Sequence, residues 1–131
     1  MTKINPQKLG RSLVMDDDPL ILKTLSSFLI RLGFEPILVK NGEEAINYFE
    51  EAHKDKNPFH FVILDFMIHN GLNGEETLKK IKQIDPKIKS ILSSGYKNEI
   101  LARYEEFGFN TMLKKPYTIH ELKEAITKIF S

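Results

Sequence analysis

The sequence predicts an α/β fold in which five parallel strands form a doubly wound sheet with helices on both faces. Five short apolar runs alternate with segments whose apolar residues recur at helical spacing. Such alternation is typical of parallel strands joined by right-handed helical crossovers. Residues 59–64 are apolar apart from His60, which suits a central strand that is covered on both faces.

The composition fits one domain that acts neither on nucleic acid nor at a membrane. The 131 residues carry 19 basic and 18 acidic side chains, so the formal charge of +1 creates no field that would attract a polyanion. The most apolar stretch, residues 20–32, contains Lys23 and Arg31 and is too short to span a bilayer. There is no cysteine and no apolar signal segment near the N-terminus. We therefore expect a cytoplasmic protein with no direct nucleic-acid or membrane partner.

The first strand is expected at residues 12–15, directly before an acidic run at residues 16–18. Asp18 and Pro19 have the pattern of a helix start, with aspartate as the N-cap and proline at the first helical position. The first helix is expected to end at Gly33, because glycine adopts the left-handed conformation readily.

The second and third strands are expected at residues 36–39 and 59–64, the latter leading straight into Asp65. Asn41 opens the second helix. The third helix is expected to follow the loop at residues 68–74, which is rich in glycine and asparagine.

The fourth strand is expected at residues 88–94 and the short fifth strand at residues 111–113. Between them, apolar residues at positions 100, 101, 104 and 107 predict a fourth helix. All five helices should have about ten to fifteen residues, as is usual between parallel strands. Gly108 and the phenylalanine after it repeat the end of the first helix, and the last helix should begin near Thr118.

Of the doubly wound strand orders, 2-1-3-4-5 fits a chain of this length and places the first and third strands side by side. Ligands bind outside the carboxyl ends of such strands, so Asp16, Asp17 and Asp65 should converge there. Close carboxylates repel one another, and an oxygen-only cluster with no cysteine or nearby histidine suits Mg²⁺. Taken alone, Asp65 would more simply be an N-cap or a solvated loop acid, and it is the neighbouring residues that favour a site.

The last two strands bring hydroxyl groups and an ammonium group to the same edge. Ser93 and Ser94 close the fourth strand, and Lys115 follows the fifth strand. A lysine ammonium can neutralise a phosphate as a point charge. Each residue has an ordinary explanation of its own, but together they indicate a site for phosphoryl chemistry.

At these motifs the chain resembles the receiver domains of two-component response regulators, which have a flavodoxin-like (βα)5 fold. The resemblance assigns residues 11–131 to the receiver domain and residues 1–10 to an N-terminal extension. Four motifs carry it in the family's order: Val-Met-Asp-Asp-Asp-Pro at 14–19, Leu-Asp at 64–65, Leu-Ser-Ser-Gly-Tyr at 92–96 and Lys-Lys-Pro-Tyr at 114–117.

The resemblance implies that Asp65 accepts a phosphoryl group from a histidine kinase or a histidine phosphotransfer protein. Asp17 and Asp65 would hold Mg²⁺, with Asp16 acting through water and the Met67 backbone carbonyl completing the protein ligands. The domain would then be no enzyme beyond assisting its own phosphorylation and slow dephosphorylation.

The resemblance also implies roles for the other two strand ends. Ser93 would close on the phosphoryl oxygens, Lys115 would pair with them, and Ser94 would lie at the same ligand-binding edge. The bond before Pro116 would be cis. Phosphorylation would change the face made by the fourth helix, the fifth strand and the fifth helix, which a downstream protein would read.

The loop after Asp65 departs from the common family pattern. The family usually has Met-Pro there and a glycine eight residues after the aspartate. This chain has Ile68 and His69, and Gly74 lies nine residues on. Together with Ser-Ser-Gly-Tyr at 93–96, this loop makes the chain similar to receivers at the ends of hybrid sensor kinases.

A second departure is Met112, which stands where the family often has an aromatic residue. Methionine fills gaps with little rotamer preference, so we expect Ser93 and residues 95–104 to carry most of the phosphorylation-dependent change. No output domain follows Ser131 in the sequence. A single-domain regulator and a receiver from a larger protein therefore both stay open.

Two other functions are compatible with parts of the pattern. A phosphatase of the haloacid dehalogenase type also uses a strand-end aspartate, but it needs a second one two residues on, where this chain has Met67. A receiver-like module could instead bind its partner without phosphorylation. The four histidines show no ligand spacing and are expected on the surface or in loops: His53, His60, His69 and His120.

Overall fold

Five parallel strands form one sheet in the order β2-β1-β3-β4-β5, which confirms the predicted fold class and strand order. The computed structural model describes residues 9–68, 71–95 and 98–131. The strands are β1 (Gly10–Met15), β2 (Phe34–Val39), β3 (Phe61–Asp65), β4 (Lys89–Ser94) and β5 (Thr111–Lys114). Residues 1–8 of the predicted N-terminal extension, His69 and Tyr96 lie outside the described residues.

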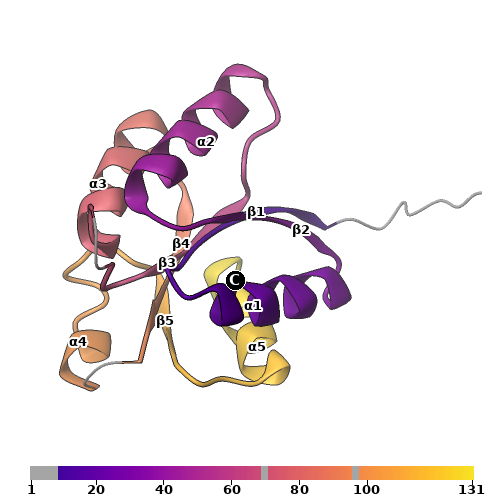
Figure 1. Ribbon diagram of the computed structural model, residues 1–131, viewed down its shortest axis with the longest axis vertical. Helices are drawn as coiled ribbons and strands as arrows, with labels where there is room; N and C mark the ends of the chain where they lie inside the picture. Colours follow the sequence, from indigo (N-terminus) through magenta and orange to yellow (C-terminus); the bar gives the residue numbers. More distant parts are fainter. Residues whose placement is uncertain (1–8, 69–70, 96–97) are drawn as a thin grey trace, which may run out of the picture.

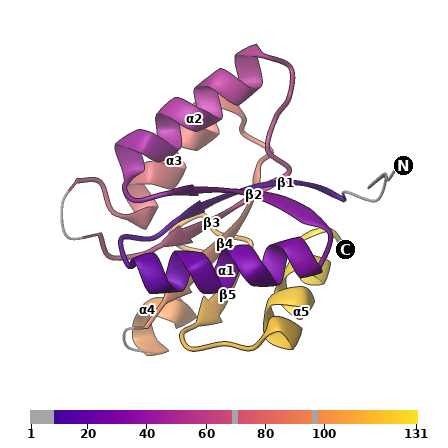
Figure 2. The same ribbon diagram turned by 45° about the vertical axis from the view of Figure 1, so that its right-hand side comes forward.

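Helices cover both faces of the sheet (Figures 1 and 2). On one face lie α1 (Pro19–Arg31) and α5 (Ile119–Ile129). On the other lie α2 (Gly42–Lys54), α3 (Gly74–Ile84) and the short α4 (Asn98–Ala102). The sheet thus separates two apolar clusters, one under each helical layer. In the described part of the chain, no helix is both long enough and apolar enough to cross a membrane.

The predicted helix starts are confirmed by their capping contacts. The Asp18 side chain accepts a hydrogen bond from the Leu20 amide at 2.9 Å, directly before Pro19. The side chains of Asn41 and Thr118 accept from the amide of the third helical residue in α2 and α5. Such caps satisfy amides that the helix itself leaves without a partner.

The fourth helix is shorter than predicted. The prediction of ten to fifteen residues is wrong, because α4 has only five. After Ala102 the chain tightens into turns, and the Arg103 and Tyr104 amides bond to carbonyls only three residues back. Among the described side chains of residues 99–107, only Leu101 is fully buried. Tertiary packing supplies most of the stability of a helix. One buried apolar side chain is therefore too little to stabilise a longer helix here.

Glycine permits a tight approach between α3 and the carboxyl end of β3. The Gly74 amide donates to the Phe66 carbonyl at 2.9 Å. A Cβ atom at Gly74 would lie only 2.5 Å from the carbonyl oxygen of Asp65. The start of α3 therefore packs directly on the backbone of Asp65.

We expect Gly74→Ala to lower the free energy of unfolding by about 1–3 kcal/mol, because the added methyl group must displace backbone rather than a flexible side chain. The comparison is urea unfolding against Gly95→Ala, whose Cβ would meet Lys115 at an ordinary 3.7 Å. A Gly74→Ala protein as stable as wild type would contradict this packing.

Candidate functional site

The alternation of side chains along the strands brings four predicted site residues to one face of the sheet. Core residues of β1, β3, β4 and β5 pack in the cluster under α1 and α5: Val14, Ile63, Ile91 and Leu113. Two positions further on come the polar residues: Asp16, Asp65, Ser93 and Lys115. Residues two apart in a strand share a face. The amides of Asp16 and Lys115 continue the ladder by bonding to the neighbouring strands.

Three carboxylates meet at this edge, as the sequence predicted. Asp16, Asp17 and Asp65 each present one oxygen, and these oxygens lie within 4.8 Å of one another. Asp16 and Asp65 are buried, with 1% and 5% of their surface exposed. Within the described residues the cluster contains neither histidine nor cysteine.

Lys115 joins the two buried carboxylates. Its Nζ atom lies 2.5 Å from Asp16 Oδ2 and 3.3 Å from Asp65 Oδ1. Asp16 uses its other oxygen to accept the Asp18 amide at 2.9 Å. Burial acts to lower the pKa of Lys115, but the carboxylates of Asp16 and Asp65 outweigh it and raise the pKa. Lys115 is therefore a fixed cation at neutral pH.

Asp65 has an unusual affinity for a proton. Burial first, and the nearby charge of Asp16 second, raise the pKa of Asp65 from 3.8 to about 6, although Lys115 opposes both. Removing a carboxylate from water and placing like charges beside it both disfavour the ionised form. A cation or a covalent substituent on Asp65 would relieve this cost.

The site has the donor set that Mg²⁺ requires. Carboxylate oxygens are hard ligands, and Mg²⁺ commonly takes one or two of them together with water and phosphate oxygens. The repulsion that raises the pKa of Asp65 also supports this fit, because a divalent cation would neutralise it. The residues present therefore suit the ion that the family resemblance implies.

Ser93 and Ser94 lie at the same edge but on different faces. Ser93 is paired with Asp65 in the register of β3 and β4. Its hydroxyl is buried and has no hydrogen-bond partner among the described residues. Ser94 comes two positions after Leu92, which packs in the cluster under α2 and α3, so alternation turns Ser94 toward that layer. A ligand-binding role for Ser94 stays a prediction.

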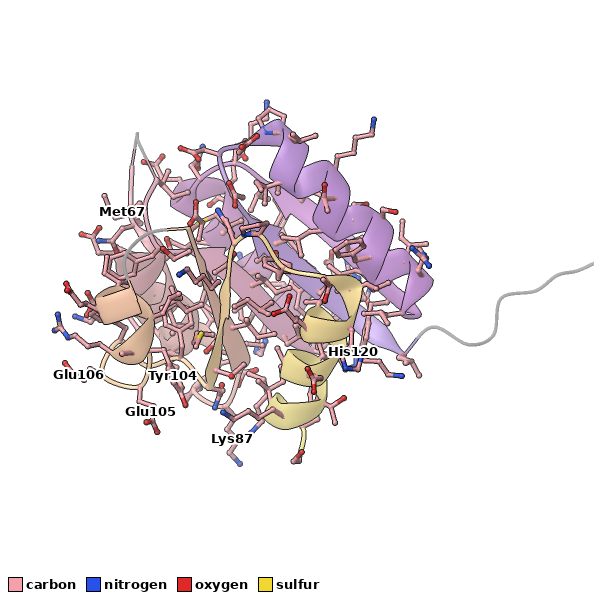
Figure 3. All side chains as sticks on the ribbon, turned by 90° about the horizontal axis from the view of Figure 1, so that it is seen from below. Met67, Lys87, Tyr104, Glu105, Glu106 and His120 are labelled. Atoms are coloured by element: carbon pink, nitrogen blue, oxygen red, sulfur yellow. The ribbon has the colours of Figure 1, made fainter. Side chains whose placement is uncertain are left out.

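The Met67 side chain is 44% exposed and lies at the periphery of the molecule (Figure 3). The part assigned to its backbone carbonyl also stays a prediction. The bond between Lys115 and Pro116 is cis, as the resemblance implied. The predicted surface positions of three histidines are confirmed: His53, His60 and His120.

Tyr117 had no predicted role, although its hydroxyl lies close to the site. The Tyr117 oxygen is buried and has no hydrogen-bond partner among the described residues. Ser93, Asp16 and Asp65 all lie close enough to influence its ionisation. The only signal in the sequence was its position directly after the lysine-proline pair, and that did not reveal where the ring would point.

Comparisons with known proteins agree with this geometry. The sequence matches the response regulator receiver domain family over residues 13–127. It is 29% identical to sporulation initiation phosphotransferase F of Bacillus subtilis over 117 residues, which are 88% of this chain and 90% of that protein. It is 30% identical over 123 residues to a probable chemotaxis protein CheY of Rhizobium etli, with 90% of each chain covered. A response regulator receiver domain protein from Clostridium thermocellum has a similar fold, with a TM-score of 0.81 at 28% identity over 92% of this chain and 94% of that one.

We expect Asp65→Asn to stabilise the metal-free protein by about 2 kcal/mol at about pH 8, because the ionised Asp65 carboxylate destabilises the folded state. The folded pKa of about 6 lies above the ordinary value of 3.8. The advantage of the variant should therefore narrow as the pH falls through 6 and close only below the ordinary pKa of 3.8, where Asp65 is protonated in both the folded and the unfolded state. Urea unfolding across this range measures it.

The matched control is Asp55→Asn, since Asp55 is exposed at the end of α2. The free energy of unfolding of this variant should be close to that of wild type, as is usual for exposed substitutions. An Asp65→Asn protein that is no more stable than wild type at high pH would contradict the raised pKa.

Proposed function

This chain belongs to the response regulator receiver domain family, and on that premise we propose that it is a phosphoacceptor switch in a two-component, His-to-Asp phosphorelay. Asp65 is the residue that receives the phosphoryl group. The observation that carries the proposal is the position of Asp65, a buried carboxylate at the carboxyl end of the central strand with the Lys115 ammonium 3.3 Å away.

The transfer begins with an attack by one Asp65 oxygen on the phosphorus of a phosphohistidine. An O–P bond forms while the N–P bond breaks, and the imidazole nitrogen keeps the electron pair of that bond. Asp65 must be ionised to act as nucleophile, and a pKa of about 6 leaves it largely ionised at neutral pH. Lys115 is placed to neutralise charge on the phosphoryl oxygens.

Asp17, Asp65 and the Met67 backbone carbonyl would hold Mg²⁺, with Asp16 acting through water. When bound, Mg²⁺ neutralises charge on the acidic cluster and on the phosphoryl oxygens. Asp16 itself already accepts from Lys115 and from the Asp18 amide. It therefore serves chiefly to fix the lysine.

The acyl phosphate brings up to about two negative charges to the edge of the sheet. Ser93, paired with Asp65 across β3 and β4, would donate its hydroxyl to a phosphoryl oxygen. The change would pass to the face made by α4, β5 and α5, where Tyr104, Glu105, Glu106 and His120 lie (Figure 3). Since α4 is short and only lightly buried, it can be rearranged at low cost.

The partners that fit this function are a histidine kinase or a histidine phosphotransfer protein as donor and a downstream protein as receiver of the signal, all in the cytoplasm. Met67 stands where a phosphatase of the haloacid dehalogenase type needs its second aspartate. This supports a phosphoacceptor in preference to a turnover enzyme.

We expect the wild-type protein to gain one phosphoryl mass from acetyl phosphate in the presence of Mg²⁺, and Asp65→Asn to gain none, because the amide is no nucleophile. Intact-protein mass spectrometry measures the gain. Asp55→Asn, at an exposed position, is the control and should be labelled like wild type. Labelling of Asp65→Asn at the wild-type rate would contradict the assignment.

A further inference from the structure

Two buried hydroxyl groups lie near Asp16 and Asp65, at the carboxyl ends of the strands. Ser93 Oγ and Tyr117 Oη are both shielded from solvent, and neither has a hydrogen-bond partner among the described residues. A buried hydroxyl without a partner costs stability, and such groups call for an explanation. Other buried groups of this kind lie elsewhere in the molecule, at Arg11, Ser12 and Thr77.

The two hydroxyls are neighbours, and in this structure the geometry between them falls short of a full hydrogen bond. Burial raises the pKa of Tyr117, the nearby Ser93 hydroxyl acts to lower it, and the negative charges of Asp16 and Asp65 add to the rise. The phenol is therefore protonated at neutral pH and able to donate. It faces the same cluster of charges that Lys115 joins.

Tyr117 lies in the connection between β5 and α5, where its ring and the backbone after it are both anchored. It packs against the apolar cluster under α1 and α5. Directly after it, Thr118 caps α5 in a reciprocal pair of hydrogen bonds with Glu121, at 2.8 and 3.1 Å. A ring that is fixed in this way can aim its hydroxyl group at one place.

A serine hydroxyl has one proton to donate and two lone pairs to accept with. When Ser93 donates to a phosphoryl oxygen, its own oxygen becomes a better acceptor, because hydrogen bonds in a chain polarise one another. The Tyr117 hydroxyl is then the nearby donor that can form a hydrogen bond to Ser93 Oγ.

We propose that Tyr117 is a positioning residue for the phosphorylated state. In that state Ser93 donates to a phosphoryl oxygen on Asp65, and the Tyr117 hydroxyl donates to Ser93 Oγ. The inference rests on the proposed function of Asp65. It gives the phosphoryl group a connection through Ser93 and Tyr117 to the N-terminus of α5, separate from any change in α4.

The test is Tyr117→Phe, with beryllofluoride and Mg²⁺ as the stand-in for the phosphoryl group. We expect beryllofluoride to bind about tenfold more weakly, the loss of roughly one hydrogen bond to a polarised acceptor. Without beryllofluoride and Mg²⁺, the melting temperature should stay the same or rise by a few degrees, because the variant removes a buried hydroxyl that has no partner. Tyr48→Phe is the control, since Tyr48 lies on α2 and is 49% exposed.

A second test asks whether Tyr117 acts through Ser93 or contacts the phosphoryl group directly. In Ser93→Ala the further change Tyr117→Phe should have no effect on beryllofluoride affinity, because the acceptor is gone. If Tyr117→Phe still lowers beryllofluoride affinity tenfold in Ser93→Ala, Tyr117 acts independently of Ser93. This result would overturn the proposal.

Two other results would also overturn it. One is a wild-type affinity of Tyr117→Phe for beryllofluoride. The other is a fall in the melting temperature of the free Tyr117→Phe protein, which would show a purely structural role. If the wild-type protein neither binds beryllofluoride nor takes up a phosphoryl group, the proposed function of Asp65 fails, and that result is distinct from a failure at Tyr117 alone.

Discussion

The Lys115 ammonium between the buried carboxylates of Asp16 and Asp65 is the interaction on which the rest of the site depends. Three carboxylates meet one ammonium at this edge, so the cluster is left with an excess of negative charge. Burial first, and this negative charge second, raise the pKa of Asp65. The same excess of charge makes the site receptive to a cation. In the proposed function the same lysine would neutralise charge on a phosphoryl group.

The fold supplies this arrangement by simple means. Each polar residue stands two positions beyond an apolar residue of one core cluster, so packing under α1 and α5 fixes the direction in which all four side chains point. The contact between Asp16 and Lys115 then joins the ends of β1 and β5, which are not neighbours in the sheet. The hydrogen bond from the Asp18 amide extends the same contact to the start of α1.

Local patterns were sufficient to predict the strand order, the helix caps and the meeting of the acids, because strand alternation and capping depend on short stretches of sequence. The length of α4 was predicted wrongly, since apolar spacing at positions 100–107 does not say how much surface tertiary packing will bury. The sequence placed Ser93 and Ser94 at the same edge, and the core packing of Leu92 shows that they face opposite sides of the sheet. The position of the Tyr117 hydroxyl depends on the backbone conformation of the connection between β5 and α5, and no short sequence pattern specifies that conformation.

The central claim is that Asp65 is a buried carboxylate whose charge is only partly compensated until a cation or a phosphoryl group arrives. The most direct measurement is the titration of the Asp65 side-chain carboxyl carbon by NMR, with and without Mg²⁺. The account predicts a pKa of about 6 in the metal-free protein and a markedly lower pKa when Mg²⁺ is present. A pKa close to the ordinary 3.8 that does not respond to Mg²⁺ would contradict it.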